Sequence, residues 1–330
     1  MRSSTSTSKQ TAKARAAAIK PPQYVSWLAI AMLAWSVGLV YNVFLGGEAY
    51  WLKRLYWQKR AIASEISEPK LMITGGSGAH YTVNSKQLSA ELGRPVVNFG
   101  LDGPLGLDVI LSSTLESVKP GDVVLLVPEY LILQAADAGF EEGYREKSGM
   151  FVLAIGEPRT GEVPAKQLAL NLIQLGVPSL RWTVKAVGDL AQKGRFTGYY
   201  DGPLTPQGDP IETKPREGDW WSLQVQPASA HAIARIAQFK IEVEERGGRL
   251  VLAAPWFYSK DPTEQTLDNI DRIIEQLEAI APVLVDEDSL NIQRNAALFA
   301  DTHYHLKPEG RELRSQQLAQ QLEPLLTESE

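Results

Sequence analysis

An uncharged apolar segment near the N-terminus constrains this chain more than any other feature. Residues 24–45 read YVSWLAIAMLAWSVGLVYNVFL and contain no acidic or basic side chain. At about 1.5 Å per residue, a helix of that length crosses the roughly 30 Å hydrocarbon core of a bilayer. We expect an uncleaved transmembrane anchor over 24–46. A cleaved signal peptide and a buried core helix are the two alternatives.

The charge distribution predicts which end of this anchor faces the cytoplasm. Residues 1–23 carry five basic side chains and no acidic one, whereas the whole 330-residue chain has a net charge of −6. An excess of lysine and arginine marks the cytoplasmic flank of a membrane span. We therefore expect a disordered basic cytoplasmic tail over 1–23, a single pass through the cell membrane, and a main domain outside the cytoplasm. The acidic body excludes general nucleic-acid binding, which needs a concentrated basic face.

The rest of the sequence alternates buried-strand patterns with helix patterns. Near-continuous apolar runs, with helical segments between them, are typical of a mainly parallel sheet covered on both faces. We predict a three-layer α/β/α sandwich over 67–330, reached through a juxtamembrane helix or linker at 47–66. We interpret a long segment at about 134–225 as an insertion over one end of the sheet. The predicted strands are 70–74, 95–99, 122–128, 249–255 and 282–286.

The candidate catalytic residues follow predicted strands. Parallel sheets bind their ligands at these carboxyl ends of the strands. Ser77 lies in the segment GGSGAH after the first strand, and a serine on such a glycine-flanked turn exposes its hydroxyl. Serine is a weak nucleophile until a histidine, oriented by a carboxylate, takes its proton. Two of the four histidines, His303 and His305, stand beside Asp301 ahead of the last helix.

Other interpretations of the same residues stay open. The segment at 75–80 is also consistent with a glycine-rich turn that only reverses the chain, and it lacks the Lys-Ser/Thr pair of a phosphate-binding loop. Asp301, His303 and His305 also fit an H-x-H metal site or plain surface polarity. The chain has no cysteine and no third nearby histidine, so we expect neither a metal nor a cofactor.

These motifs resemble the SGNH/GDSL hydrolase superfamily, whose fold is flavodoxin-like. With the anchor, the segments GGSGAHY and DTHYHL resemble a membrane-anchored branch that includes the DltD-like and alginate O-acetylation proteins. The resemblance implies Ser77 as the nucleophile and His305 as the general base, oriented by Asp301. It leaves His303 as an alternative base. It also implies an oxyanion hole formed by the backbone N–H groups of Ser77 and Gly100.

The sequence departs from the family pattern in two places. The G-x-N-D block expected after the third strand is missing, and Pro128-Glu129-Tyr130 stands there instead. Glu129 can replace the missing amide as a hydrogen-bond donor only when its carboxyl group is protonated. The second departure is the spacing of the acid and the base, because Asp301 precedes His305 by four residues instead of three.

Aromatic side chains offer a further candidate surface for binding a sugar. Glu129, Tyr130, Trp220 and Trp221 are the candidate substrate-binding residues. Aromatic rings in a loop either stack on a ligand or anchor the loop by packing, and both interpretations stand. The same two interpretations apply to Tyr199, Tyr200 and Trp256.

The combined expectation is a membrane-anchored serine esterase or acyltransferase that acts on an O-acyl group of a cell-envelope glycan or polymer. The alternative is a non-catalytic SGNH-like module that binds a polymer or scaffolds an envelope-modifying enzyme. The expected partners are the lipid bilayer, a glycan or polymer substrate and, from the family resemblance, a membrane-bound acyltransferase. Nucleic acid is not an expected partner.

Overall fold

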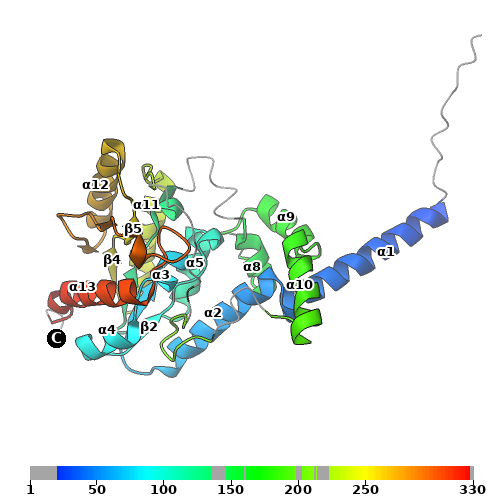
Figure 1. Cartoon of the computed structure of the whole chain (residues 1–330), viewed down its shortest axis with the longest axis horizontal. Coiled ribbons are helices and arrows are strands. Elements are labelled where there is room, and N and C mark those ends of the chain that lie inside the picture. Colours follow the sequence, from blue (N-terminus) through cyan, green and yellow to red (C-terminus); the bar gives the residue numbers. More distant parts are fainter. Residues whose placement is uncertain are drawn as a thin grey trace, which may run out of the picture.

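A long apolar helix precedes a mixed α/β domain, as Figure 1 shows. The helical run Gln23–Glu65 is long and apolar enough to cross a membrane, which agrees with the predicted N-terminal apolar helix. It is built from α1 (Pro21–Val40), the π-helical η1 (Tyr41–Leu45) and α2 (Glu48–Glu65). Nearly all of the predicted tail lies outside the described residues. The computed structural model describes residues 21–134, 146–159, 161–197, 203–211, 213 and 223–327.

The domain is built on a five-stranded sheet with the order β2-β1-β3-β4-β6. Every neighbouring pair in this sheet is parallel. Each strand falls within one of the five predicted apolar runs, so the predicted mainly parallel sheet is confirmed. A smaller parallel sheet pairs β5 (Phe257–Tyr258) with β7 (Ile292–Gln293). The five strands are β1 (Leu71–Thr74), β2 (Val96–Asn98), β3 (Val123–Leu126), β4 (Arg249–Ala253) and β6 (Val283–Leu284).

Alternate side chains of the strands enter two separate apolar clusters. Met72 and Leu252 belong to the cluster that α2, α5, α11 and α12 complete. Ile73 and Val251 belong to the cluster that α4 and α13 complete. This alternation gives the sheet an apolar surface on both faces, as a buried parallel sheet requires. The helices are α4 (Ser85–Leu92), α5 (Leu107–Leu115), α11 (Ala230–Glu245), α12 (Glu264–Glu278) and α13 (Pro308–Thr327).

Helix α2 is part of the domain core and not a free linker. Its buried residues include Trp51, Leu55 and Tyr56, which lie in the same apolar cluster as side chains of the sheet. The Tyr56 ring packs edge-on against Phe151 of α8 (Ser148–Ile155), with the ring centroids 5.4 Å apart. The stretch predicted as a juxtamembrane helix or linker therefore connects the apolar helix directly to the sheet.

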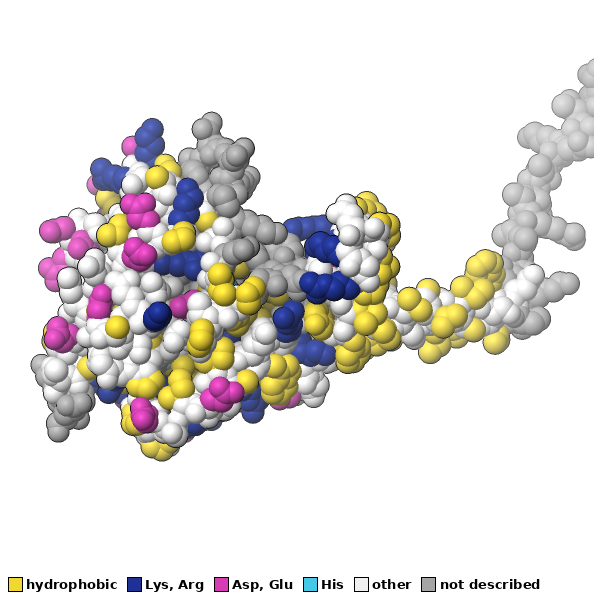
Figure 2. Space-filling view, turned by 60° about the horizontal axis from the view of Figure 1, so that its bottom comes forward, with side chains coloured by type: hydrophobic (Ala, Val, Ile, Leu, Met, Phe, Trp, Pro, Cys, Tyr) yellow, Lys and Arg dark blue, Asp and Glu magenta, His cyan; other side chains and the backbone are white. Residues whose placement is uncertain are grey.

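The described part of the insertion occupies two locations instead of the one end of the sheet that we expected. Helices α9 (Ala165–Leu175) and α10 (Leu180–Lys193) lie beside the end of α1, where Trp35 Nε1 donates to the carbonyl of Ile173 at 3.1 Å. Figure 2 shows apolar side chains along α1 and on the adjoining helices. Residues 203–211 instead reach the carboxyl end of β2, where the Asn98 N–H donates to the carbonyl of Gln207 at 2.8 Å.

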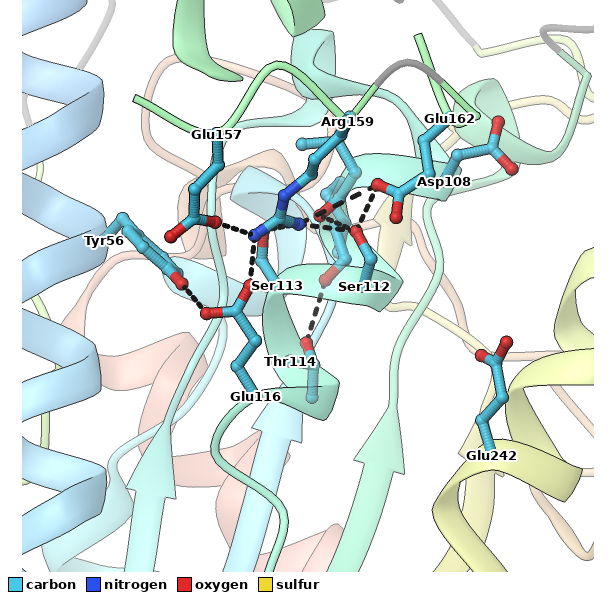
Figure 3. Close-up of polar contacts among 12 residues, drawn as sticks. Tyr56, Asp108, Ser112, Ser113, Thr114, Glu116, Glu157, Arg159, Glu162 and Glu242 are labelled. Carbon is cyan, nitrogen blue, oxygen red and sulfur yellow. Dashed lines mark hydrogen bonds and ion pairs between the residues drawn. The ribbon is translucent and has the colours of Figure 1, made fainter. Parts of the chain in front are cut away.

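A polar cluster around Arg159 holds the insertion against the end of α5 (Figure 3). Arg159 Nη1 donates to Ser112 Oγ at 2.6 Å and to Ser113 Oγ at 3.1 Å. Its Nη2 donates to the carboxylates of Glu116 and Glu157. Charge-assisted hydrogen bonds of this kind are about twice as strong as neutral ones. The chain between α8 and α9 is therefore attached to the sheet domain.

Candidate active site

Ser77 begins a short helix, α3 (Ser77–His80), at the carboxyl end of β1. Two glycines make the tight approach of this turn to the end of β3 possible. A Cβ on Gly75, whose φ is +150°, would lie 2.3 Å from the carbonyl oxygen of Val127. A Cβ on Gly76 would lie 2.1 Å from Glu129 Oε2. Both distances are far below van der Waals contact, so a side chain at either position would force neighbouring atoms at the end of β3 to shift.

Glu129, immediately beyond β3, is the carboxyl group that Ser77 contacts. Ser77 Oγ donates to Glu129 Oε1 at 3.2 Å, and the Gly78 N–H donates to the same oxygen. The side chain is buried, and within the described structure its Oε2 has no hydrogen-bond partner. Burial raises the pKa of Glu129 to about 7, against the lowering effect of the two hydrogen bonds. The candidate nucleophile therefore meets a carboxyl group that titrates near neutral pH.

Asp301 and His305 form a hydrogen-bonded pair. His305 Nδ1 lies 2.7 Å from Asp301 Oδ1. The loop that carries them is held by Thr302, whose Oγ1 accepts from the N–H of His305 at 3.1 Å. The imidazole packs against the ring of Tyr81, with centroids 4.4 Å apart. The carboxylate thus holds one ring nitrogen, and packing restrains the orientation of the ring.

The loop of His305 contacts the helix of Ser77 through backbone hydrogen bonds. The Leu306 N–H donates to the carbonyl of Tyr81 at 3.2 Å, and the Tyr81 N–H donates to the carbonyl of Ser77 at 3.0 Å. The two side chains are not hydrogen-bonded to each other, because Ser77 Oγ donates to Glu129 and His305 Nε2 is buried without a partner in the described part of the chain. Catalytic hydrogen bonds are often long or poorly aligned before substrate binds and tighten in the complex.

His303 has different surroundings from His305. Its ring stacks on that of Tyr258 with the centroids 6.4 Å apart, and its carbonyl accepts from the Tyr258 N–H at 2.9 Å. Tyr258 belongs to the small β5–β7 sheet. Because Asp301 hydrogen-bonds to His305, the geometry favours His305 over His303 as the base.

Gly100 is used for packing at the end of β2. Its N–H, which the family resemblance assigns to the oxyanion hole, donates to Asn98 Oδ1 at 3.0 Å. A Cβ at this position would lie 2.3 Å from the backbone nitrogen of His80. The glycine thus allows α3 to approach the strand end, and its N–H is already occupied. An oxyanion hole that includes Gly100 would require this hydrogen bond to break.

A buried polar network beneath α3 was not expected from the sequence. Lys59 of α2 is completely buried, with Nζ 2.8 Å from His80 Nδ1 and 3.0 Å from Asn98 Oδ1. Asn98 Nδ2 donates in turn to Asp209 Oδ1 at 2.9 Å, and Asp209 also accepts from Ser85. Burial and the neighbouring Lys59 lower the pKa of His80 well below its usual value. The network ties the helix that carries Ser77 to α2 and to residues 203–211.

The sequence contains little that could have identified this network. Lys59 stands in an aromatic and basic stretch beside Lys53, Arg54 and Arg60, and its local pattern does not distinguish it from them. Asp209 lies in a turn rich in glycine and proline, where aspartate is common for local reasons. Only the placement of α2 against the sheet brings these residues together.

The remaining candidate residues divide between packing positions and the undescribed part of the chain. Tyr130 is buried on α6 (Tyr130–Gln134), edge-on to Phe257 with centroids 5.4 Å apart. Trp256 is buried, and its Nε1 donates to Gln317 Oε1 at 2.6 Å, which favours the packing interpretation. Within the described ranges no group of three metal-ligating side chains occurs. Trp220, Trp221, Tyr199 and Tyr200 lie outside the described residues.

Comparison with known proteins adds no family to these observations. No family model matches the chain, and no curated protein matches it.

Proposed function

We propose that the chain is a membrane-anchored serine esterase or acyltransferase with an SGNH-like three-layer α/β/α sandwich. Its substrate would be an O-acyl group of a cell-envelope glycan or polymer. The observation that carries the proposal is the hydrogen-bonded contact between the helix of Ser77 and the loop that holds the Asp301–His305 pair. A serine, a histidine and a carboxylate are the three groups that an acyl-enzyme mechanism requires.

In the proposed reaction, Ser77 Oγ attacks the acyl carbonyl carbon and His305 Nε2 takes the hydroxyl proton. This step breaks the hydrogen bond from Ser77 to Glu129. His305 then gives the proton to the oxygen of the leaving alcohol, and the acyl group stays on Ser77. Water or a second hydroxyl group attacks the acyl-enzyme, loses its proton to His305, and releases the acyl product as that proton returns to Ser77 Oγ. Asp301 stabilises the protonated Nδ1 throughout.

The membrane part of the proposal depends on α1. Its side chains are exposed on all sides over residues 23–34, with Val25 69% and Leu33 68% exposed. A helix that is apolar all round belongs in a protein core or a bilayer, and the described chain provides no core around it. The basic flank at 1–23 supports a cytoplasmic N-terminus and an extracytoplasmic domain in the cell membrane.

The two histidines of the DTHYHL segment provide a matched test of the proposed function. We expect His305→Ala to lower kcat/KM for acetyl-ester hydrolysis by about 10³-fold or more, because it removes the proton acceptor. His303→Ala should lower kcat/KM less than about tenfold, since the His303 ring lies against Tyr258. Hydrolysis of a chromogenic acetyl ester by the purified full-length variants measures both effects. Equal losses, or none in either variant, would contradict the assignment of His305.

A non-catalytic module that binds a polymer or scaffolds a membrane-bound acyltransferase is the second candidate function. Two observations favour it: Ser77 Oγ donates to Glu129 instead of the histidine, and the Gly100 N–H is occupied by Asn98. An intact chain that binds an acetylated polymer but neither hydrolyses esters nor transfers acyl groups would establish this alternative.

A further inference from the structure

Helices α9 and α10 present an apolar face that the described part of the protein leaves uncovered. On α10, Val184 and Val187 are 63% and 65% exposed, and they lie opposite the buried residues Trp182 and Asp189. Leu180, at the start of the helix, is 79% exposed. The face therefore points away from the sheet domain. Its other exposed apolar residues are Leu170, Ile173, Val177 and Leu190.

This face is continuous with the surface of α1. The backbone carbonyl of Ile173 accepts from Trp35 at 3.1 Å, and that of Leu175 accepts from Asn42 Nδ2 at 3.2 Å. A Cβ on Gly38 would lie 2.1 Å from the carbonyl oxygen of Gly176, so the two backbones meet without an intervening side chain. Figure 2 shows the apolar side chains of the hairpin and of α1 side by side.

The position of these contacts along α1 determines how deep the hairpin lies in a bilayer that α1 spans. Trp35 lies ten residues before Leu45, which is about 15 Å along a helix axis. The whole α1–η1 run of 25 residues is about 37 Å long, against a hydrocarbon core of roughly 30 Å. A hydrocarbon core of roughly 30 Å placed over residues 21–40 extends about 7 Å past Trp35, so a bilayer that surrounds α1 also reaches the α9–α10 hairpin that packs there.

The charges of the hairpin favour a lipid surface over a second protein. Residues 165–197 contain five basic side chains and one acidic side chain. Arg181 and Arg195 are exposed, and Lys193 is 51% exposed. Basic side chains beside an apolar helical face are typical of helices that lie in the interface of an anionic membrane.

We propose that the apolar face of α9 and α10 inserts into the leaflet on the domain side of the bilayer that α1 spans. The contact is a second attachment to the membrane. The Arg159 cluster connects the hairpin to the sheet domain through the bonds of Arg159 to Ser112 and Glu116. It holds the carboxyl end of the sheet at a defined orientation to the membrane surface. This inference depends on the proposed span of α1 and not on the chemistry of Ser77.

Single cysteines test the proposal directly, because the natural chain contains none. Full-length Val184→Cys and Val187→Cys variants are labelled with an environment-sensitive fluorophore and reconstituted into vesicles of phosphatidylcholine and phosphatidylglycerol. Nitroxide groups near the top of the acyl chains should quench more than about half of the fluorescence at either position. The matched control is Ile241→Cys, an apolar residue of α11 that is 49% exposed, and its label should not be quenched.

A label at Leu33 of α1, tested with nitroxide groups deep in the acyl chains, distinguishes the span of α1 from the membrane contact of the hairpin. Quenching at Leu33 and Val184, but not at Ile241, supports the membrane contact of the hairpin. Quenching at Leu33 without quenching at Val184 overturns it, and a blue-shifted but unquenched Val184 label would show that protein covers the face. Absence of quenching at Leu33 as well would overturn both the span of α1 and the hairpin contact.

Discussion

Replacing Ser77 with alanine is expected to abolish labelling by a fluorophosphonate and to lower acetyl-ester hydrolysis by about 10³-fold or more. The reason is that Ser77 Oγ forms the covalent bond in both reactions. The fold should survive, because Ser77 is partly exposed and its side chain makes a single hydrogen bond to Glu129. Gel fluorescence and mass spectrometry of the labelled peptide measure the first effect, and hydrolysis of a chromogenic acetyl ester measures the second.

Ser89 provides the matched control for this experiment. It is also partly exposed on a helix, and its Oγ donates to the backbone carbonyl of Arg94. Ser89→Ala should therefore leave labelling and turnover unchanged. Retained labelling in the Ser77→Ala variant would exclude Ser77 as the nucleophile. A natural chain that is folded but takes up no label would favour the scaffold function.

The activity of the natural chain should fall as the pH rises through about 7, because Glu129 ionises there. The ionised carboxylate accepts the Ser77 hydroxyl and places a negative charge near the developing oxyanion. The protonated carboxyl group can instead donate a hydrogen bond from Oε2, the oxygen without a partner among the described residues. We expect kcat/KM for ester hydrolysis at pH 9 to be about tenfold or more below that at pH 7.

Glu129→Gln should remove this decline, because an amide of the same shape donates a hydrogen bond at every pH. Glu91→Gln, an exposed change on α4, is the control and should keep the natural pH profile. The comparison requires pH–rate profiles of the three full-length proteins. An alkaline decline of the same size in Glu129→Gln would contradict a role for the Glu129 carboxyl group.

Stability provides an independent measurement of the same ionisation. The folded pKa of Glu129, about 7, lies above its ordinary value of 4.5, so the folded chain binds the proton more tightly. The contribution of this proton to the free energy of unfolding is complete below about pH 4.5. It declines by about 3 kcal/mol as the pH rises to about 7. Urea unfolding at pH 5 and pH 8 should show this loss in the natural chain and not in Glu129→Gln. Equal pH dependence in both would mean that Glu129 ionises at its ordinary pKa.

Several features of the fold follow from local sequence patterns. The run of uncharged residues at 24–45 predicts the apolar helix, because length and composition alone decide whether a segment can span a bilayer. The five apolar runs predict the strands of the parallel sheet, because a strand buried on both faces needs apolar side chains throughout. Asp301 and His305 are four residues apart, so a single loop suffices to bring their side chains together.

Other features depended on residues that are distant in the sequence. The contact of Ser77 with Glu129 joins residues that follow two different strands, and its consequence for the pKa of Glu129 depends on burial. The hydrogen bonds from Lys59 to His80 and Asn98 depend on the docking of α2 against the sheet. Burial and charge proximity belong to the packed structure, and a local pattern does not encode them.

The sequence by itself determined the apolar helix, the positions and parallel direction of the main strands, and the residues from which a serine site could be built. Tertiary structure decided which of them meet: Glu129 lies against Ser77, His305 pairs with Asp301 while His303 packs on Tyr258, and the α9–α10 hairpin lies beside α1. The physical reason is that helix and strand formation follows the periodicity of neighbouring residues. The partners and ionisation of a side chain depend instead on contacts between segments that only folding brings together.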